Sequence, residues 1–130
     1  MQRNLSRPLS PHMTATRWGP HMIVSMLHRV TGGFLSIFGA ILLVWWLLAA
    51  ADGEPSYARF VAWVAWPWAL ILWVPLSWAL FQHTLSGLRH LVMDAGAGFE
   101  LRTNRFWAFT TLFLSLALTT GLWVYILVPR

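Results

Sequence analysis

Residues 30–51 read VTGGFLSIFGAILLVWWLLAAA, a run of 22 positions without a charged side chain. About 20 mostly apolar residues are enough for a helix to cross the hydrocarbon core of a bilayer. Two further runs without a charge follow, over residues 60–88 and 106–128. The sequence therefore predicts an all-α membrane protein with three transmembrane helices.

The composition of the whole chain supports this class. Of its 130 residues, 58% are hydrophobic and only 10% are charged, whereas about 25% of the residues of a soluble domain are charged. Ten tryptophans also favour a membrane protein, because tryptophan is enriched at the membrane–water interface. The chain has no cysteine, which excludes disulfides, a thiolate nucleophile and a cysteine-ligated zinc or iron–sulfur site.

The length of the chain allows one domain. We expect a polar N-terminal arm over residues 1–21 and an anchor domain over residues 22–130, with spans of approximately 22–51, 60–92 and 106–128. The arm does not have the order of charged segment, apolar segment and cleavage site that is typical of a secretory signal. Three prolines argue against one continuous helix in the arm: Pro8, Pro11 and Pro20.

The distribution of arginine predicts the orientation in the membrane. All nine basic residues are arginines, and only Arg59 and Arg130 lie in the first loop or the tail. The positive-inside rule then places the N-terminus in the cytoplasm and the C-terminus outside. A nucleic-acid binder is disfavoured, because its basic residues would be divided among membrane loops. Seven arginines lie on the predicted cytoplasmic side: Arg3, Arg7, Arg17, Arg29, Arg89, Arg102 and Arg105.

This topology brings the start of the first span and the end of the second span into one layer. Ser25 and Arg29 are four residues apart and share one face of the first span. His83, Gly87 and His90 share one face of the second span. The side chains of Arg29, Arg89 and His90 either extend to lipid headgroups or form part of a binding site within the protein. Six polar residues of this layer require an explanation: Ser25, His28, Arg29, His83, Arg89 and His90.

His83 is the histidine that lies well within a span. It is about five to six residues inside the apolar boundary, roughly 8–9 Å at the helical rise. An ionisable residue at that depth usually has a partner or a function. His83 is therefore either a neutral side chain bonded to a neighbouring helix, a proton-transfer group or a ligand. Histidine can ligate haem iron, and Gly87 would leave room for the macrocycle. Ser25 and Arg29 are suited to bind a quinone carbonyl.

Prolines and small residues add expectations about packing. Pro67 is tolerated in a first turn, whereas Pro75 should lose the hydrogen bond to the Ile71 carbonyl and kink the second span. Small residues recur every four positions, which either permits close helix contact in lipid or only reflects the composition of membrane helices: Gly32, Ser36 and Ala40, and Ala117 and Gly121.

Two segments resemble a known family. They are RPLSPHMTATRWGPHMIVSMLHRVTG, residues 7–32, and HTLSGLRHLVMDAG, residues 83–96. Both resemble the signatures of the cytochrome b556 subunit of succinate dehydrogenase, the larger membrane anchor of respiratory complex II. The resemblance covers the arm, S-x-x-H-R-x-T-G in the first span, H-x-x-x-G-x-R-H-L-x-x-D-x-G in the second, and a third span. The family often has tyrosine where this chain has Thr16, which bears on contacts of the arm.

The resemblance implies roles for seven residues. His83 would be an axial ligand of the iron of haem b, and the other ligand would be a histidine of the second anchor subunit. Ser25 and Arg29 would contact ubiquinone or menaquinone. His28 and Arg29 would lie near the haem propionates. His90 would either contact a propionate or lie behind the residues that bind the haem. Arg89 and Asp94 would serve structure or subunit docking.

The implied function is that of a membrane anchor of succinate–quinone oxidoreductase in the bacterial inner membrane. Its partners would be a second small membrane anchor subunit, an iron–sulfur subunit and a flavoprotein subunit, together with lipid and quinone but no nucleic acid. Succinate chemistry would take place on the other subunits. Two alternatives are an anchor of a quinol–fumarate reductase, which runs the reverse reaction, and a structural three-span scaffold in which His83 only packs.

Overall fold

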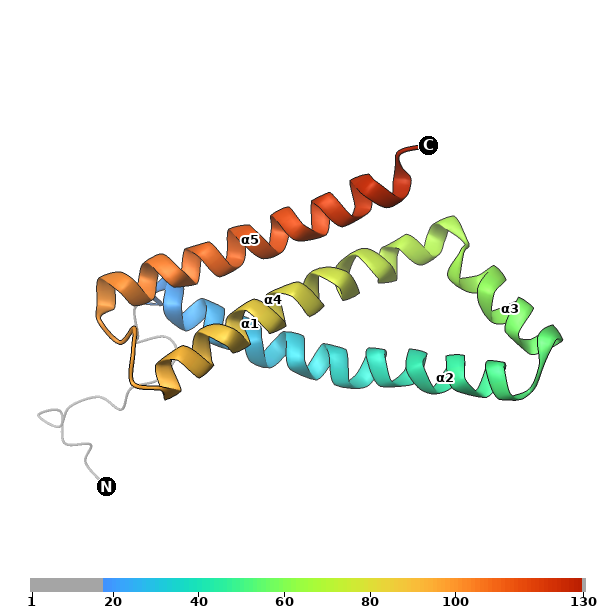
Figure 1. The fold of residues 1–130 in the computed structure, drawn as a ribbon, viewed down its shortest axis with the longest axis horizontal. Helices are drawn as coiled ribbons and strands as arrows, with labels where there is room; N and C mark the ends of the chain where they lie inside the picture. Colours follow the sequence, from blue (N-terminus) through green and yellow to red (C-terminus); the bar gives the residue numbers. More distant parts are fainter. Residues whose placement is uncertain (1–17, 130) are drawn as a thin grey trace, which may run out of the picture.

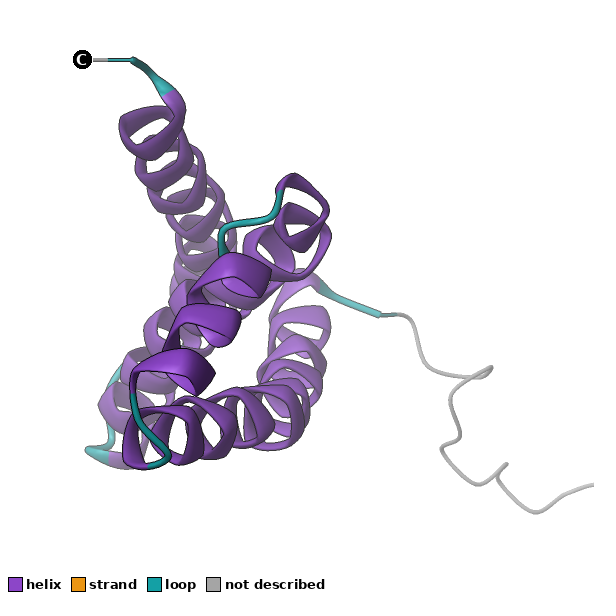
Figure 2. Cartoon of the chain, turned by 90° about the vertical axis from the view of Figure 1, so that its right-hand side faces the viewer, coloured by secondary structure: helices purple, strands orange, loops and turns teal. Residues whose placement is uncertain are grey.

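The computed structural model describes residues 18–129, and all regular structure in this part of the chain is helical (Figures 1 and 2). The predicted arm lies mostly outside the described residues. Within them, three helical stretches are long and apolar enough to cross a membrane, as the three uncharged runs predict. The elements in chain order are α1 (Pro20–Phe34), η1 (Leu35–Gly39), α2 (Ala40–Ala51), α3 (Glu54–Val64), η2 (Pro67–Ala69), α4 (Leu70–Asp94) and α5 (Leu101–Leu127).

The first membrane-length stretch consists of α1, the π-helical segment η1 and α2, which together span Pro20–Ala51. Pro20 occupies the first turn, where its missing N–H would have no intrahelical partner in any case. The helix therefore begins two residues before the expected boundary at residue 22. It ends before Gly53, whose φ of 100° is a conformation that glycine adopts without steric cost.

The second apolar run is divided between two helices. Residues 60–64 belong to α3, and the chain changes direction at Trp66, which has an extended ψ of 137°. The residue before a proline is disfavoured in the helical conformation, and Pro67 then opens η2 in the first-turn position that the sequence predicts. The second membrane-length stretch accordingly spans Pro67–Asp94 and begins later than residue 60. Pro75 lies inside α4 without ending it.

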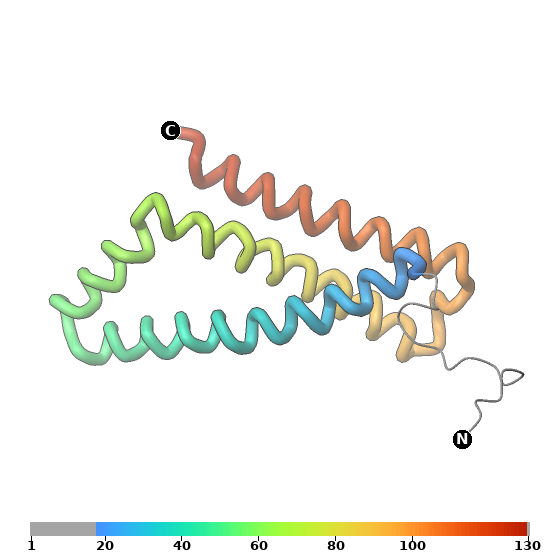
Figure 3. The backbone as a smooth tube through the Cα atoms, turned by 180° about the vertical axis from the view of Figure 1, so that it is seen from behind, coloured from blue at the N-terminus to red at the C-terminus, as the bar shows by residue number. Residues whose placement is uncertain are grey.

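The central helix of the bundle is α4, which packs against both α1 and α5. The three helices converge at the end of the molecule where α1 begins (Figures 1 and 3). At the opposite end α2 diverges from α4, and α3 connects the two like the short side of a triangle (Figure 3). The closest helix packing is therefore at the end that contains the polar layer.

Burial in this bundle follows the pattern of a membrane protein. Large apolar side chains cover the outside, whereas Gln82, Ser86 and Ser115 have no exposed surface. The Ser115 hydroxyl on α5 donates to Oε1 of Gln82 on α4 at 2.7 Å. Lipid supplies no hydrophobic force that would press helices together, so small residues and polar contacts mediate their association. This polar contact fixes the register of α5 on α4.

Only part of the small-residue pattern forms a contact within the described chain. Gly32 lies directly against a side chain of α4, whereas Ser36 and Ala40 are exposed. On α5, Ala117 is exposed, and a Cβ added at Gly121 would meet nothing within 4 Å. In the first series of small residues, Gly32 is therefore the residue that contacts α4. The pair Ala117 and Gly121 on α5 faces away from α1 and α4.

Candidate functional site

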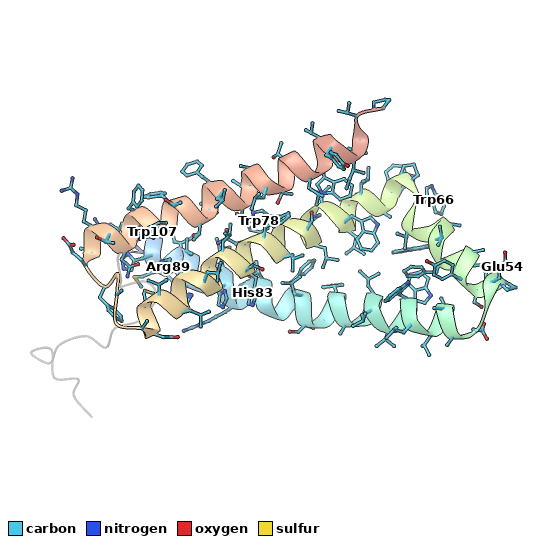
Figure 4. All side chains as sticks on the ribbon, in the orientation of Figure 1. Glu54, Trp66, Trp78, His83, Arg89 and Trp107 are labelled. Atoms are coloured by element: carbon cyan, nitrogen blue, oxygen red, sulfur yellow. The ribbon has the colours of Figure 1, made fainter. Side chains whose placement is uncertain are left out.

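Three histidines meet where α1 packs against α4, and Figure 4 labels His83 among them. His28 comes from α1, and its ring is stacked on that of His83, with centroids 4.0 Å apart and planes 4° apart. The ring of His90 lies on His28 as well, with a centroid distance of 4.9 Å and an angle of 27°. The prediction that the two polar segments meet in one layer is confirmed.

Hydrogen bonds to backbone carbonyls determine which nitrogen carries the proton in two of these rings. Nδ1 of His83 lies 3.0 Å from the carbonyl oxygen of His28, and Nδ1 of His90 lies 2.6 Å from that of Ser86. A carbonyl oxygen only accepts, so both Nδ1 atoms donate. The lone pair of each ring is therefore on Nε2, which is the arrangement of histidines that bind metals.

The third ring is oriented by Ser86, a residue that the sequence motifs did not single out. Its hydroxyl donates to the carbonyl oxygen of Gln82 at 2.6 Å, and Nδ1 of His28 lies 2.9 Å from the same hydroxyl oxygen. Because the hydroxyl has only one proton, it accepts from His28 Nδ1. The only signal for Ser86 in the sequence is that it lies one turn after His83 and before His90.

Two glycines make this approach possible. A Cβ added at Gly32 would lie 2.8 Å from Cε1 of His83, closer than real side chains come. A Cβ added at Gly87 would lie 3.3 Å from Cε1 of His28. The expectation that Gly87 leaves room beside His83 is therefore not what this chain shows, because the ring of His28 lies against Gly87.

Ser25 and Arg29 line a different surface, a cavity of about 650 Å³ at the start of α1. His90 and Asn104 line it as well. His28, by contrast, contacts α4. The helix α1 thus presents histidine to the ring cluster and Ser25 with Arg29 to the cavity, and His90 belongs to both groups.

Arg89 does not extend to lipid headgroups. Only 9% of its surface is exposed, and its Nη2 donates to Oδ1 of Asn104 on α5. Its Nε and Nη1 are buried without a hydrogen-bond partner among residues 18–129. The guanidinium therefore links α4 to α5, which fits the structural role that the resemblance implies. Asp94 is the last residue of α4, and Gly96 follows with a φ of 87°.

Among the described residues, the ring cluster does not form a complete metal site by itself. Within residues 18–129, no three His, Asp or Glu side chains are grouped so as to hold a metal ion among themselves. The imidazoles are stacked face to face, so their Nε2 atoms do not point at one centre. An iron bound by His83 would need its other axial ligand from elsewhere.

The fold and the site define a multi-pass helical membrane protein with an imidazole cluster where its helices converge. Residues 3–122 match the model of the family described as succinate dehydrogenase/fumarate reductase transmembrane subunit. The cytochrome b556 subunit of succinate dehydrogenase from Paracoccus denitrificans is 41% identical over 97 residues, covering 74% of this chain and 73% of its own. The same subunit from Rickettsia felis is 33% identical over 118 residues, 91% of each chain. The cytochrome b560 subunit from Reclinomonas americana is 31% identical over 127 residues, 93% and 87% of the two chains.

The chain therefore belongs to the succinate dehydrogenase/fumarate reductase transmembrane subunit family. Its function is that of a cytochrome b membrane anchor subunit of succinate dehydrogenase, respiratory complex II. It is a multi-pass membrane protein that works in a complex with other subunits. The family match and the ring cluster agree with the two motifs from which the resemblance was drawn.

Replacing Gly32 by alanine tests the contact between α1 and α4. The new methyl group must displace the ring of His83, and overpacking of this kind typically costs about 1–3 kcal/mol. Gly33→Ala is the matched control, because a Cβ there meets nothing within 4 Å; alanine in a helix is otherwise favoured by up to about 1 kcal/mol. Thermal unfolding of the purified complex should show a lower Tm for Gly32→Ala and an equal or higher Tm for Gly33→Ala. Equal melting of the two variants would contradict the contact.

Proposed function

We propose that this chain binds one axial position of a haem b through Nε2 of His83 and forms part of a quinone site with Ser25 and Arg29. The observation that carries the haem assignment is the position of His83, about two turns nearer the middle of the stretch Pro67–Asp94 than His90, together with the hydrogen bond between His83 Nδ1 and the His28 carbonyl oxygen. This hydrogen bond leaves Nε2 as the nitrogen with the lone pair and holds the ring in one orientation. A haem b supplies one-electron transfer when bound, and the curated relatives are named cytochromes b.

The surrounding side chains fit that group. Gly32 allows the His83 ring to lie on α1, and Thr31 Oγ1 lies 3.4 Å from its Nδ1. His28 and Arg29 are consecutive residues in the middle of α1, and both would lie near the propionates, where the guanidinium of Arg29 supplies the positive charge. His90 supports His28 from the other side by stacking, which makes it a group that orients rather than ligates. The second axial histidine would come from the second small membrane anchor subunit.

The cavity beside Ser25 and Arg29 fits a quinone head. The Ser25 hydroxyl and the Arg29 guanidinium are four residues apart on one face of α1, and both line this cavity. Both groups donate hydrogen bonds, and a guanidinium bonds most strongly to an oxygen that gains negative charge. Reduction of a quinone to a quinol consumes two electrons and two protons, so charge builds on the carbonyl oxygen in the course of the reaction. Ubiquinone is the proposed substrate, and menaquinone has the same carbonyl chemistry.

The electrons would come from succinate oxidised outside this chain. This chain has no cysteine, so the iron–sulfur clusters belong to an iron–sulfur subunit, which a flavoprotein subunit would supply with electrons. Both would dock at the end of the bundle that holds the ring cluster and the cavity. The complex would lie in a bacterial inner membrane and pass electrons from succinate to the quinone.

We place that end of the bundle in the cytoplasm. The start of α1, the end of α4 and the start of α5 lie together (Figure 1). Of the five arginines among residues 18–129, four lie at this end, whereas Arg59 lies in α3 at the other end. Positive charge favours the cytoplasmic side. A reporter enzyme fused to the C-terminus should therefore be active only in the outer compartment. Activity of such a fusion in the cytoplasm would reverse the orientation.

The haem assignment predicts different spectra for two leucine variants of the complex. His83→Leu keeps an apolar helical residue but removes the axial nitrogen, so the haem should be lost or become high-spin. His90→Leu should retain low-spin ligation and change at most the haem potential, because His90 acts through its contact with His28. Low-temperature absorption and electron paramagnetic resonance distinguish the two. A normal low-spin haem in His83→Leu, together with a disrupted one in His90→Leu, would transfer the ligand to His90.

The quinone assignment predicts a selective loss of one activity. Removing a charged hydrogen bond costs about 1.5–3 kcal/mol, so Arg29→Ala should weaken quinone reduction about 10-fold or more. Ser25→Ala should act in the same direction with a smaller effect. Succinate oxidation by an artificial soluble acceptor should stay unchanged in both assembled complexes.

A matched control for this experiment is Arg105→Ala. Arg105 is an exposed arginine at the same end of the bundle, and it does not line the cavity. It should leave both activities unchanged, since only general surface charge is removed. Equal losses of both activities in the Arg29 variant, with a normal haem content, would argue against a quinone role.

A further inference from the structure

A second cavity lies beside the one that holds Ser25 and Arg29. It has a volume of about 280 Å³ and is formed between α4 and α5, with Leu88 and Val92 on one side and Trp107 and Leu114 on the other. We call it the α4–α5 slot. Its walls are almost entirely apolar, and these four side chains are exposed at the outer surface of the bundle. The slot is therefore open to the lipid phase.

The slot shares a wall with the cavity that Ser25 and Arg29 line. Both are lined by Arg89, Met93 and Asn104, so a layer of single side chains separates them. On one side of this wall lie Ser25 and Arg29, and on the other side the lining is apolar. Figure 4 shows Arg89 of α4 and Trp107 of α5 at the same end of the bundle.

The three residues of the wall differ in how firmly they are held. Arg89 and Asn104 are joined by a hydrogen bond across the two helices. Met93 has only a weak contact, in which Asn104 Nδ2 donates to its sulfur at 3.6 Å. An unbranched thioether side chain changes its conformation readily. Met93 is thus the part of the wall that can move while the link between α4 and α5 stays in place.

A cavity that contains hydrogen-bond donors, separated by a movable side chain from an apolar slot that opens to lipid, matches a ligand with a polar head and a long apolar tail. We propose that the α4–α5 slot holds the isoprenoid tail of the quinone whose head lies beside Ser25 and Arg29. This inference rests on the proposed quinone site. The tail crosses the wall at Met93 and reaches the lipid between α4 and α5.

The test uses the assembled complex with a tryptophan that fills the slot. Leu114→Trp should raise the KM for a quinone with a long isoprenoid tail about 10-fold or more, since a hydrophobic pocket discriminates by that factor even for one methylene. The KM for a quinone with the same head and no isoprenoid tail should stay unchanged, as should succinate oxidation by an artificial acceptor. Phe113→Trp is the control, because Phe113 is the neighbouring exposed residue of α5 and does not line the slot.

Thr110→Phe provides a second, independent filling of the slot from one turn earlier on α5, in case Leu114→Trp does not assemble. An unchanged KM for the long-tailed quinone in an assembled slot variant would overturn the proposal. An equal rise for both quinones would also overturn it, because the substitution would then act on the head site. Loss of a co-purifying phospholipid with unchanged quinone kinetics would assign the slot to a lipid acyl chain instead.

The tail assignment and the head assignment fail in different ways. If only the tail assignment is wrong, Arg29→Ala still impairs reduction of the quinone without a tail, and filling the slot has no selective effect. If the quinone site itself is wrong, Arg29→Ala leaves reduction of that short quinone unchanged. Comparing the two variants with the two quinones therefore tests each proposal separately.

Discussion

The hydrogen bond between His83 and the backbone carbonyl of His28 is the contact on which the arrangement of the site depends. It joins the middle of α4 to the start of α1, and it selects the Nδ1 proton and leaves Nε2 free. The stacking of His28 on His83 requires the same close approach, which Gly32 and Gly87 make possible. Because a backbone carbonyl is present whatever side chain stands at position 28, this hydrogen bond does not require the imidazole of His28.

Polar contacts have the structural role here that apolar packing has in a soluble protein. Gln82, Ser86 and Ser115 are enclosed between helices whose outer surfaces are apolar. In lipid, an unpaired polar group is costly, so each enclosed hydroxyl or amide favours one register of its helix. The Arg89–Asn104 contact does the same for the ends of α4 and α5. Arg89 and Asn104 therefore both link α4 to α5 and line the two cavities.

Hydropathy and spacing predict much of this molecule, because the bilayer restricts a spanning segment to a helix of a certain length. The three spans, and the meeting of His28 with His83, follow from that restriction. The division of the second apolar run does not, since residues 60–66 are as free of charge as the span that follows. The burial of Arg89 depends on Asn104, which lies on the next helix. No local pattern reveals such a partner, and the same is true of Ser86.

The length of the first helix determines how the proposed quinone site meets water. Pro20–Ala51 has 32 residues, about 48 Å at 1.5 Å per residue, whereas the hydrocarbon layer is about 30 Å thick. Even a tilt of about 40°, the upper end of the usual range, leaves an excess. The uncharged run begins at Val30, so the turns that project beyond the hydrocarbon are those that contain Ser25 and Arg29. The proposed quinone site therefore lies at the edge of the hydrocarbon layer, and protons for a quinol formed there need not cross the bilayer.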